Sequence, residues 1–216
     1  MPLAALAWRA FGLAGSTLGA NPVDEITDTL GKWGLRLLLL TLAITPLRQL
    51  TDWPHWQRFR RMLGLFAFFY VALHFAMYLA VDQSFAWSVL WEDVSKRPWV
   101  TLGFAALVLL VPLAVTSTRG WMRRLGRRWQ RLHYAVYVAT ALGCWHYYWQ
   151  VKLDVRSPLL YVAAFALLMG WRLWRRAARR QVAPPAPGNP VRGPAAGLRP
   201  AAILPKLRLP RAADSQ

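Results

Sequence analysis

The sequence is poor in cysteine and in acidic residues, and each shortage excludes a class of protein. Its 216 residues include one cysteine, Cys144, so the chain can form neither an internal disulfide nor a cluster of thiolate ligands. It contains no C-x-x-C-H run, which excludes covalent attachment of a c-type haem. Asp and Glu number only 9 against 27 Lys and Arg, and this imbalance gives a formal net charge of +18.

A charge this high is typical of nucleic-acid binders, yet 56% of the residues are hydrophobic and 13 are tryptophan. A soluble nucleic-acid binder is seldom so apolar, and the same hydrophobic fraction excludes a disordered protein. The sequence also lacks a Gly-rich phosphate loop and a Ser/His/Asp set. We therefore expect no nucleic-acid partner, and the positive charge needs another explanation.

Long runs without a charged residue explain the apolar composition. Residues 62–81, 98–118 and 132–151 form three such runs of 20, 21 and 20 residues. About 20 helical residues cross a hydrocarbon core about 30 Å thick, so each run predicts a membrane-spanning helix. Residues 33–47, whose only charge is Arg36, and residues 157–171 predict two more. The expected fold is an all-α, polytopic membrane helix bundle over residues 32–175, placed in a lipid bilayer.

The two ends of the chain differ from this bundle. Residues 1–20 are apolar except for Arg9 and predict a short hydrophobic first helix, which brings the expected number of spans to about six. A signal peptide and an interfacial segment are the alternatives. Residues 181–216 hold 8 of the 15 prolines and five basic residues, a composition that predicts a disordered, basic, Pro/Ala-rich cytoplasmic tail. We find no internal repeat in the sequence.

The loops alternate in charge, and this alternation sets the orientation. Basic residues are concentrated after the second, fourth and sixth expected helices, whereas the loops between these are acidic or mixed. Lys and Arg are retained on the cytoplasmic side of a membrane, so we expect both termini in the cytoplasm. The net charge of +18 then reports topology rather than nucleic-acid binding.

Histidines are the main candidates for chemistry. His55 lies in a loop, and we interpret it as a surface residue. His74 lies near the middle of the third expected helix, and His133 and His146 lie at opposite ends of the fifth. Ionisable residues inside a membrane are costly and usually functional. Three histidines on two helices favour a metal cofactor, and two imidazoles can saturate a haem iron.

Depth in the membrane favours one pair of histidines. At about 1.5 Å per residue, His74 lies about 18 Å and His146 about 24 Å from the cytoplasmic surface, whereas His133 lies only about 5 Å inside. We therefore predict that His74 and His146 hold one haem b in the periplasmic half.

His133 lies 13 residues before His146, a rotation of about 220° on a straight helix. The two histidines therefore face nearly opposite ways, unless a kink near Gly143 brings them onto one face. His133 is expected to serve a second haem, a quinone or a flavin, or only to bond near the headgroups.

Arginines at the helix ends are further candidate ligands. Arg60 and Arg61 abut the third expected helix, and Arg131 abuts the fifth. The guanidinium fork matches a carboxylate in geometry, so these residues are expected to pair with haem propionates or with a quinone. Simple retention on the cytoplasmic side explains them equally well.

Several short motifs together resemble one family. They are Arg60-Arg61-Met62-Leu63-Gly64-Leu65, Leu73-His74, Thr116-Ser117-Thr118, Leu132-His133 and His146-Tyr147. The chain resembles the MsrQ (YedZ) family of haem-binding membrane subunits of bacterial protein-methionine-sulfoxide reductase systems, within the ferric-reductase-like transmembrane group. The resemblance covers about residues 20–180.

The resemblance implies properties that spacing cannot show. It implies haem b held by the residues that match the family's histidines, His74, His133 and His146, and FMN as an associated cofactor. It implies electrons from the quinone pool and a periplasmic molybdenum-cofactor reductase as the partner that repairs oxidised methionine in envelope proteins. It also implies the bacterial inner membrane and an electron-transfer role rather than a catalytic one.

Two other functions use the same residues. Another cytochrome b, such as a metal-ion reductase, shares the haem and differs in its electron acceptor. A transporter or anchor without haem uses the histidines to relay protons or to fix helices. We expect no buried carboxylate within the predicted spans and see no paired broken helices, and both points disfavour the transporter.

Overall fold

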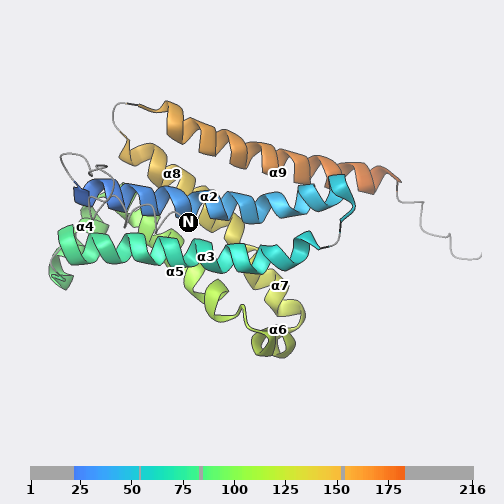
Figure 1. The fold of residues 1–216 in the computed structure, drawn as a ribbon, viewed down its shortest axis with the longest axis horizontal. Helices are drawn as coiled ribbons and strands as arrows, with labels where there is room; N and C mark the ends of the chain where they lie inside the picture. The colour runs from blue at the N-terminus through green and yellow to red at the C-terminus, as the bar shows by residue number, and fades with distance from the viewer. Residues whose placement is uncertain (1–21, 54, 83–84, 152–153, 183–216) are drawn as a thin grey trace, which may run out of the picture.

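The computed structural model describes residues 22–53, 55–82, 85–151 and 154–182, and within these ranges all regular structure is helical (Figure 1). The first expected helix, residues 1–20, and the expected tail from residue 183 onward lie outside the described residues. In chain order the elements are α2 (Pro22–Thr51), α3 (Trp56–Met77), the π-helical η2 (Tyr78–Asp82), α4 (Trp87–Lys96), α5 (Pro98–Val115), α6 (Arg119–Leu125), α7 (Arg127–His133), α8 (Ala135–Gln150) and α9 (Arg156–Val182).

Four helical segments are long and apolar enough to cross a membrane, namely α2, α3 with most of η2, α5 and α9. Helix α8 has 16 residues, fewer than a typical span, and it packs along α5. The prediction of an all-α membrane bundle is therefore confirmed.

Two helix pairs form the centre of the bundle. Helix α2 packs along α3, and α5 packs along α8. Ala67 and Ala139 are fully buried between the helices, and such small residues let helix backbones approach closely in a membrane. Helix α9 lies outside these pairs, beside α8 and α2 (Figure 1). Most of its residues are exposed, as expected for a helix that faces lipid.

Basic residues gather at one end of the bundle. That end carries the turn between α2 and α3, the short helices α6 and α7, and the last turns of α9 (Figure 1). Gly126 joins α6 to α7 with a φ of +49°, a conformation that glycine adopts without the penalty of a Cβ. The opposite end carries α4 and the first turn of α2, which is acidic. This distribution agrees with the alternation of charge expected from the loops.

Helix α2 begins earlier than expected. The apolar run predicted a start near residue 33, with Asp24 and Glu25 in a loop, but α2 begins at Pro22. The two carboxylates occupy its first turn, where the positive end of the helix dipole stabilises them. Proline at the start of a helix costs no hydrogen bond, because the first N–H groups have no partner within the helix.

The expected single helix over 132–151 is wrong. Helix α7 ends at His133 and α8 begins at Ala135. The N–H of Tyr134 donates to the carbonyl of Arg131 at 3.2 Å, a bond that spans three residues and tightens the turn. Helix α8 then continues through Gly143, so the interruption lies at Tyr134 rather than at the glycine.

Candidate functional site

A cavity of about 490 Å³ lies between α2, α3, α5 and α8, in the half of the bundle opposite the basic end. Its walls are mostly apolar and include Leu35, Val71, Phe75, Phe104 and Leu107. Its charged lining residues are Asp24, Asp28, Lys32 and Arg97. A cavity of this size and lining is typical of a cofactor site.

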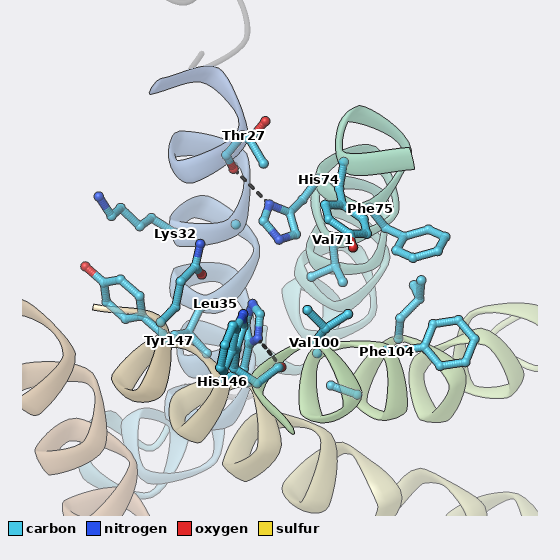
Figure 2. A pocket seen from close by; sticks show the side chains of 18 of the residues that line it. Thr27, Lys32, Leu35, Val71, His74, Phe75, Val100, Phe104, His146 and Tyr147 are labelled. Atoms are coloured by element: carbon cyan, nitrogen blue, oxygen red, sulfur yellow. Dashed lines mark hydrogen bonds between the residues drawn. The ribbon is translucent and has the colours of Figure 1, made fainter. Parts of the chain in front are cut away.

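His74 of α3 and His146 of α8 both project into this cavity (Figure 2). Their ring centroids are 6.2 Å apart, and their ring planes are inclined by 73°. The two residues belong to different helix pairs, so the packing of one pair against the other brings them together. Of the histidines selected from the sequence, these two are the ones that the structure places side by side.

Each of the two rings is fixed by a main-chain carbonyl. Nδ1 of His74 bonds the carbonyl oxygen of Thr27 at 2.8 Å, and Nδ1 of His146 bonds that of Trp99 at 2.7 Å. A carbonyl can only accept a hydrogen bond, so Nδ1 donates in both rings and Nε2 keeps its lone pair. A hydrogen bond on the far nitrogen is the usual way of orienting a metal-binding histidine.

A glycine faces each ring. A Cβ added to Gly31 would lie 3.0 Å from Nδ1 of His74, and one added to Gly103 would lie 3.0 Å from Nδ1 of His146. Each glycine follows the bonded carbonyl residue by four positions, about one helical turn. The carbonyl residue and the glycine of each seat therefore lie on the same face of one helix. We call these arrangements the imidazole seats: Thr27 with Gly31 for His74, and Trp99 with Gly103 for His146.

The two seats hold two imidazoles that can bind one metal ion whose remaining ligands come from a macrocycle. Among the described residues, no group of three or more His, Cys, Asp or Glu side chains is placed to hold a metal ion. Two imidazoles on one metal, with bonds of about 2 Å each, place their ring centres about 6 Å apart, close to the observed 6.2 Å. A tetrapyrrole supplies the four remaining nitrogens and suits the apolar walls, so haem b fits this site.

His133 lies outside the cavity. It is the last residue of α7, and its ring stacks on Trp129 with the centroids 3.9 Å apart. Its Nδ1 bonds the carbonyl of Trp129 at 3.1 Å, and its Nε2 is buried without a hydrogen-bond partner in the described part of the chain. His133 therefore shares no site with His74 and His146 and belongs to the basic end.

The three candidate arginines also lie away from the histidine pair. Arg60 precedes His74 by 14 residues of α3, a separation of about 21 Å along the helix. Arg61 is about 20 Å away by the same measure, and Arg131 lies in α7 beside His133. None of the three lines the cavity.

Sequence reasoning missed the residues that complete the site. The cations that line the cavity are Lys32 and Arg97, and the glycines of the seats are Gly31 and Gly103. One signal in the sequence could have indicated the two cations. Lys32 and Arg97 lie near the loops expected on the periplasmic side, where positive residues are scarce. The glycines gave no signal, because glycine is common in membrane helices.

The chain is similar to known proteins over most of its length. The model of the ferric reductase like transmembrane component family matches residues 30–144. The protein-methionine-sulfoxide reductase heme-binding subunit MsrQ of Xanthomonas axonopodis pv. citri is 52% identical over 194 residues, which cover 86% of this chain and 89% of that relative. The protein of the same name from Caulobacter vibrioides is 55% identical over 174 residues, covering 80% of this chain and 81% of the relative.

The chain belongs to the MsrQ family. The family resemblance read from the short motifs is thereby confirmed. The ferric-reductase-like match includes His74 and both seat glycines, and it ends two residues before His146. The names of the MsrQ relatives describe them as heme-binding subunits. No solved structure matches the chain.

Proposed function

We propose that this MsrQ family member is the haem b-binding electron-transfer subunit of a protein-methionine-sulfoxide reductase in a bacterial inner membrane, with both termini in the cytoplasm. It takes electrons from the quinone pool and delivers them to a periplasmic, molybdenum-containing catalytic subunit that repairs envelope proteins. The names of the relatives support the haem and the reductase system. The quinone and the molybdenum partner are supported by the motif resemblance alone.

One observation carries the proposal. Two imidazoles lie 6.2 Å apart in a mostly apolar cavity, and each has its Nδ1 bonded to a carbonyl so that Nε2 faces inward as a ligand. Haem b at this position supplies reversible one-electron transfer. The carbonyl bonds of Thr27 and Trp99 fix the ring orientations and raise the basicity of the ligands. The apolar walls limit the access of water.

The position of the cavity supports delivery of electrons to the periplasm. The residues that line the cavity lie in the half of the bundle away from the basic end, and positive residues are retained on the cytoplasmic side. A site in this half is close to a partner that docks from the periplasm.

The opposite half offers polar groups for the quinone. Nε2 of His133 is buried without a hydrogen-bond partner among the described residues. Arg60, Arg61 and Arg131 lie at the same end. A quinol headgroup carries two hydroxyls. Nδ1 of His133 donates to the carbonyl of Trp129, so its Nε2 can accept a hydrogen bond from a quinol hydroxyl, and the arginines can donate to the quinol oxygens. We therefore assign these four residues to quinol oxidation rather than to the ligands of the haem between His74 and His146.

Absorption spectra of the purified full-length protein test the haem. We expect the split band of a low-spin, bis-histidine haem after reduction with dithionite, and its loss in His74→Ala and His146→Ala. His55→Ala is the matched control, because His55 is exposed and distant from the cavity. A wild-type protein without a chromophore, or an unchanged band in both cavity variants, would overturn the proposal.

Reconstitution of the protein in vesicles distinguishes a methionine sulfoxide reductase from a ferric chelate as the electron acceptor. In vesicles that contain quinol, this chain is expected to be required for reduction of a molybdenum-containing methionine sulfoxide reductase added on the outside. Equal reduction without the chain removes that partner from the proposal. Faster reduction of a ferric chelate than of the reductase favours a metal-ion reductase instead. Flavin released on denaturation of the same preparation tests for FMN.

A further inference from the structure

Lys32 and Arg97 lie beside the two imidazole seats. Lys32 directly follows Gly31 of one seat, and Arg97 precedes Trp99 of the other by two residues. Histidines aside, they are the cationic residues among the described residues that line the cavity. The cavity lining therefore includes one cation from α2 and one from the residue directly before α5.

Arg97 is fixed by a buried carboxylate. Its Nε lies 3.2 Å from Oδ1 of Asp93, and Oδ2 of Asp93 accepts a 2.6 Å hydrogen bond from the hydroxyl of Tyr78. Asp93 is only 7% exposed, and a carboxylate this buried is tolerated because it is paired and hydrogen-bonded. The pair uses Nε, so within the described part of the chain both terminal amino groups of Arg97 remain for another acceptor.

Lys32 is held less firmly. Its Nζ lies 3.3 Å from a carboxylate oxygen of Asp28 and 5.8 Å from the ring centre of Tyr147, another residue of the cavity wall (Figure 2). An ammonium has three donors, so two remain after the bond to Asp28. The side chain of Lys32 is 35% exposed and that of Arg97 is 53% exposed, so water screens part of both charges. The partner carboxylate of Lys32 is 51% exposed, whereas that of Arg97 is 10% exposed. Lys32 is therefore less firmly oriented, and we expect it to contribute less than Arg97.

We propose that Arg97 and Lys32 bind the two propionate carboxylates of haem b, with Asp93 and Tyr78 as the residues that position Arg97. The inference rests on the proposed function, because it takes haem b to lie between His74 and His146. Haem b carries two carboxylates on an apolar macrocycle, and the mostly apolar lining of this cavity includes two cations, Arg97 and Lys32.

The arginines selected from the sequence cannot take this role. Arg60 and Arg61 lie about 20 Å from His74 along α3, at the basic end of the bundle. If Arg97 and Lys32 bind the propionates, the propionate edge of the haem points away from the basic end and toward the end that carries α4. This edge is the one that a periplasmic partner approaches.

The two cations also affect the redox potential. Reduction adds one negative charge to the site, and a nearby cation stabilises that charge. Removal of the Arg97 charge is therefore expected to lower the midpoint potential. A purely structural role of Arg97 would change the stability of the protein without shifting the potential in a fixed direction.

Binding of haem b and of its dimethyl ester to the full-length apoprotein in detergent tests the proposal. The ester keeps the macrocycle and loses both carboxylates. The wild type is expected to prefer haem b, and Arg97→Gln to weaken haem b binding roughly tenfold to hundredfold, as for a lost charge-assisted hydrogen bond. Ester binding stays unchanged. Lys32→Gln is expected to show the same pattern to a smaller extent, so the test survives a poorly folded Arg97 variant.

Lys96→Gln is the matched control. Lys96 neighbours Arg97 and pairs with Glu92 one turn earlier, but it is exposed and does not line the cavity. An equal effect of Lys96→Gln, or a full preference for haem b in both cavity variants, overturns the assignment. A wild type that binds haem b and its ester equally also overturns it and leaves the proposed function intact. A wild type that binds neither refutes both.

Discussion

His74 and His146 are held in the same way by different helices. Each ring bonds a carbonyl 47 residues earlier in the chain and faces a glycine 43 residues earlier. Corresponding positions are 72 residues apart, and they are Thr27 and Trp99, Gly31 and Gly103, His74 and His146. The buried pairs Leu38 and Leu110, and Ala67 and Ala139, have the same separation. The α2–α3 and α5–α8 pairs therefore repeat one arrangement around the cavity.

The seat glycines are expected to be required for haem binding. Gly103→Ala places a Cβ 3.0 Å from two atoms of the His146 ring, and Gly31→Ala places one 3.0 Å from His74. The ring must then shift within its seat, which disturbs its bond to the carbonyl, so we expect a lower haem content in both variants, measured as haem per protein.

Gly64→Ala is the control for the seat glycines. A Cβ at Gly64 meets nothing closer than Thr41, at 3.9 Å. All three changes raise helix propensity, so a loss confined to Gly31→Ala and Gly103→Ala reports the contact with the ring. Normal haem content in both seat variants would contradict the role of the glycines.

The crossed ring planes predict a magnetic signature. The planes of His74 and His146 are inclined by 73°, and the carbonyl bonds hold this orientation. Nearly perpendicular axial imidazoles donate to different iron d orbitals and leave them close in energy. We therefore expect the ferric haem to give one strongly shifted low-spin signal in electron paramagnetic resonance at low temperature. A three-line rhombic spectrum, typical of parallel rings, would show that binding turns one ring.

His133→Ala is expected to separate haem binding from quinol oxidation. His133 stacks on Trp129 outside the cavity, so haem content and the spectrum of the His74–His146 pair should not change. Loss of one hydrogen bond to the quinone is expected to slow quinol-dependent reduction roughly fivefold. Stopped-flow spectra with quinol measure this rate, with dithionite reduction as the control. A halved haem content would instead place a second haem at His133.

Arg172 is expected to stabilise the contact between α9 and the central helices. Its guanidinium bonds the hydroxyl of Tyr137 and the carbonyl of Leu42, and it lies 4.9 Å from the centre of the Tyr137 ring. Arg172→Ala should cost about 1 to 3 kcal/mol, as for lost bonds to a charged group. Tyr137→Phe should cost about 0.6 kcal/mol, the average for a hydrogen bond between membrane helices.

Thermal unfolding in detergent measures both changes. Arg176→Ala is the control, because Arg176 is exposed on the same helix. An equal loss of thermal stability in Arg176→Ala would attribute the effect to the charge of α9 rather than to the bonds of Arg172.

Much of the architecture was predictable because membrane insertion depends on local composition. A run of about 20 uncharged residues is stable in lipid wherever it occurs, and this property located α3, α5 and α9. Depth along a helix follows from a fixed rise per residue, and this singled out His74 and His146. The break at Tyr134 was missed, because it adds no charge or proline to the run.

The sequence by itself determined the class of fold, the approximate spans and which histidines lie at similar depth, since these depend on composition and distance along the chain. Only the tertiary structure decided which groups meet. The bonds from His74 to Thr27 and from His146 to Trp99 join residues 47 apart, and the placing of Lys32 and Arg97 at the cavity depends on how each helix is rotated. Rotation is set by close packing between helices, around residues such as Ala67 and Ala139, and no single run of sequence encodes it.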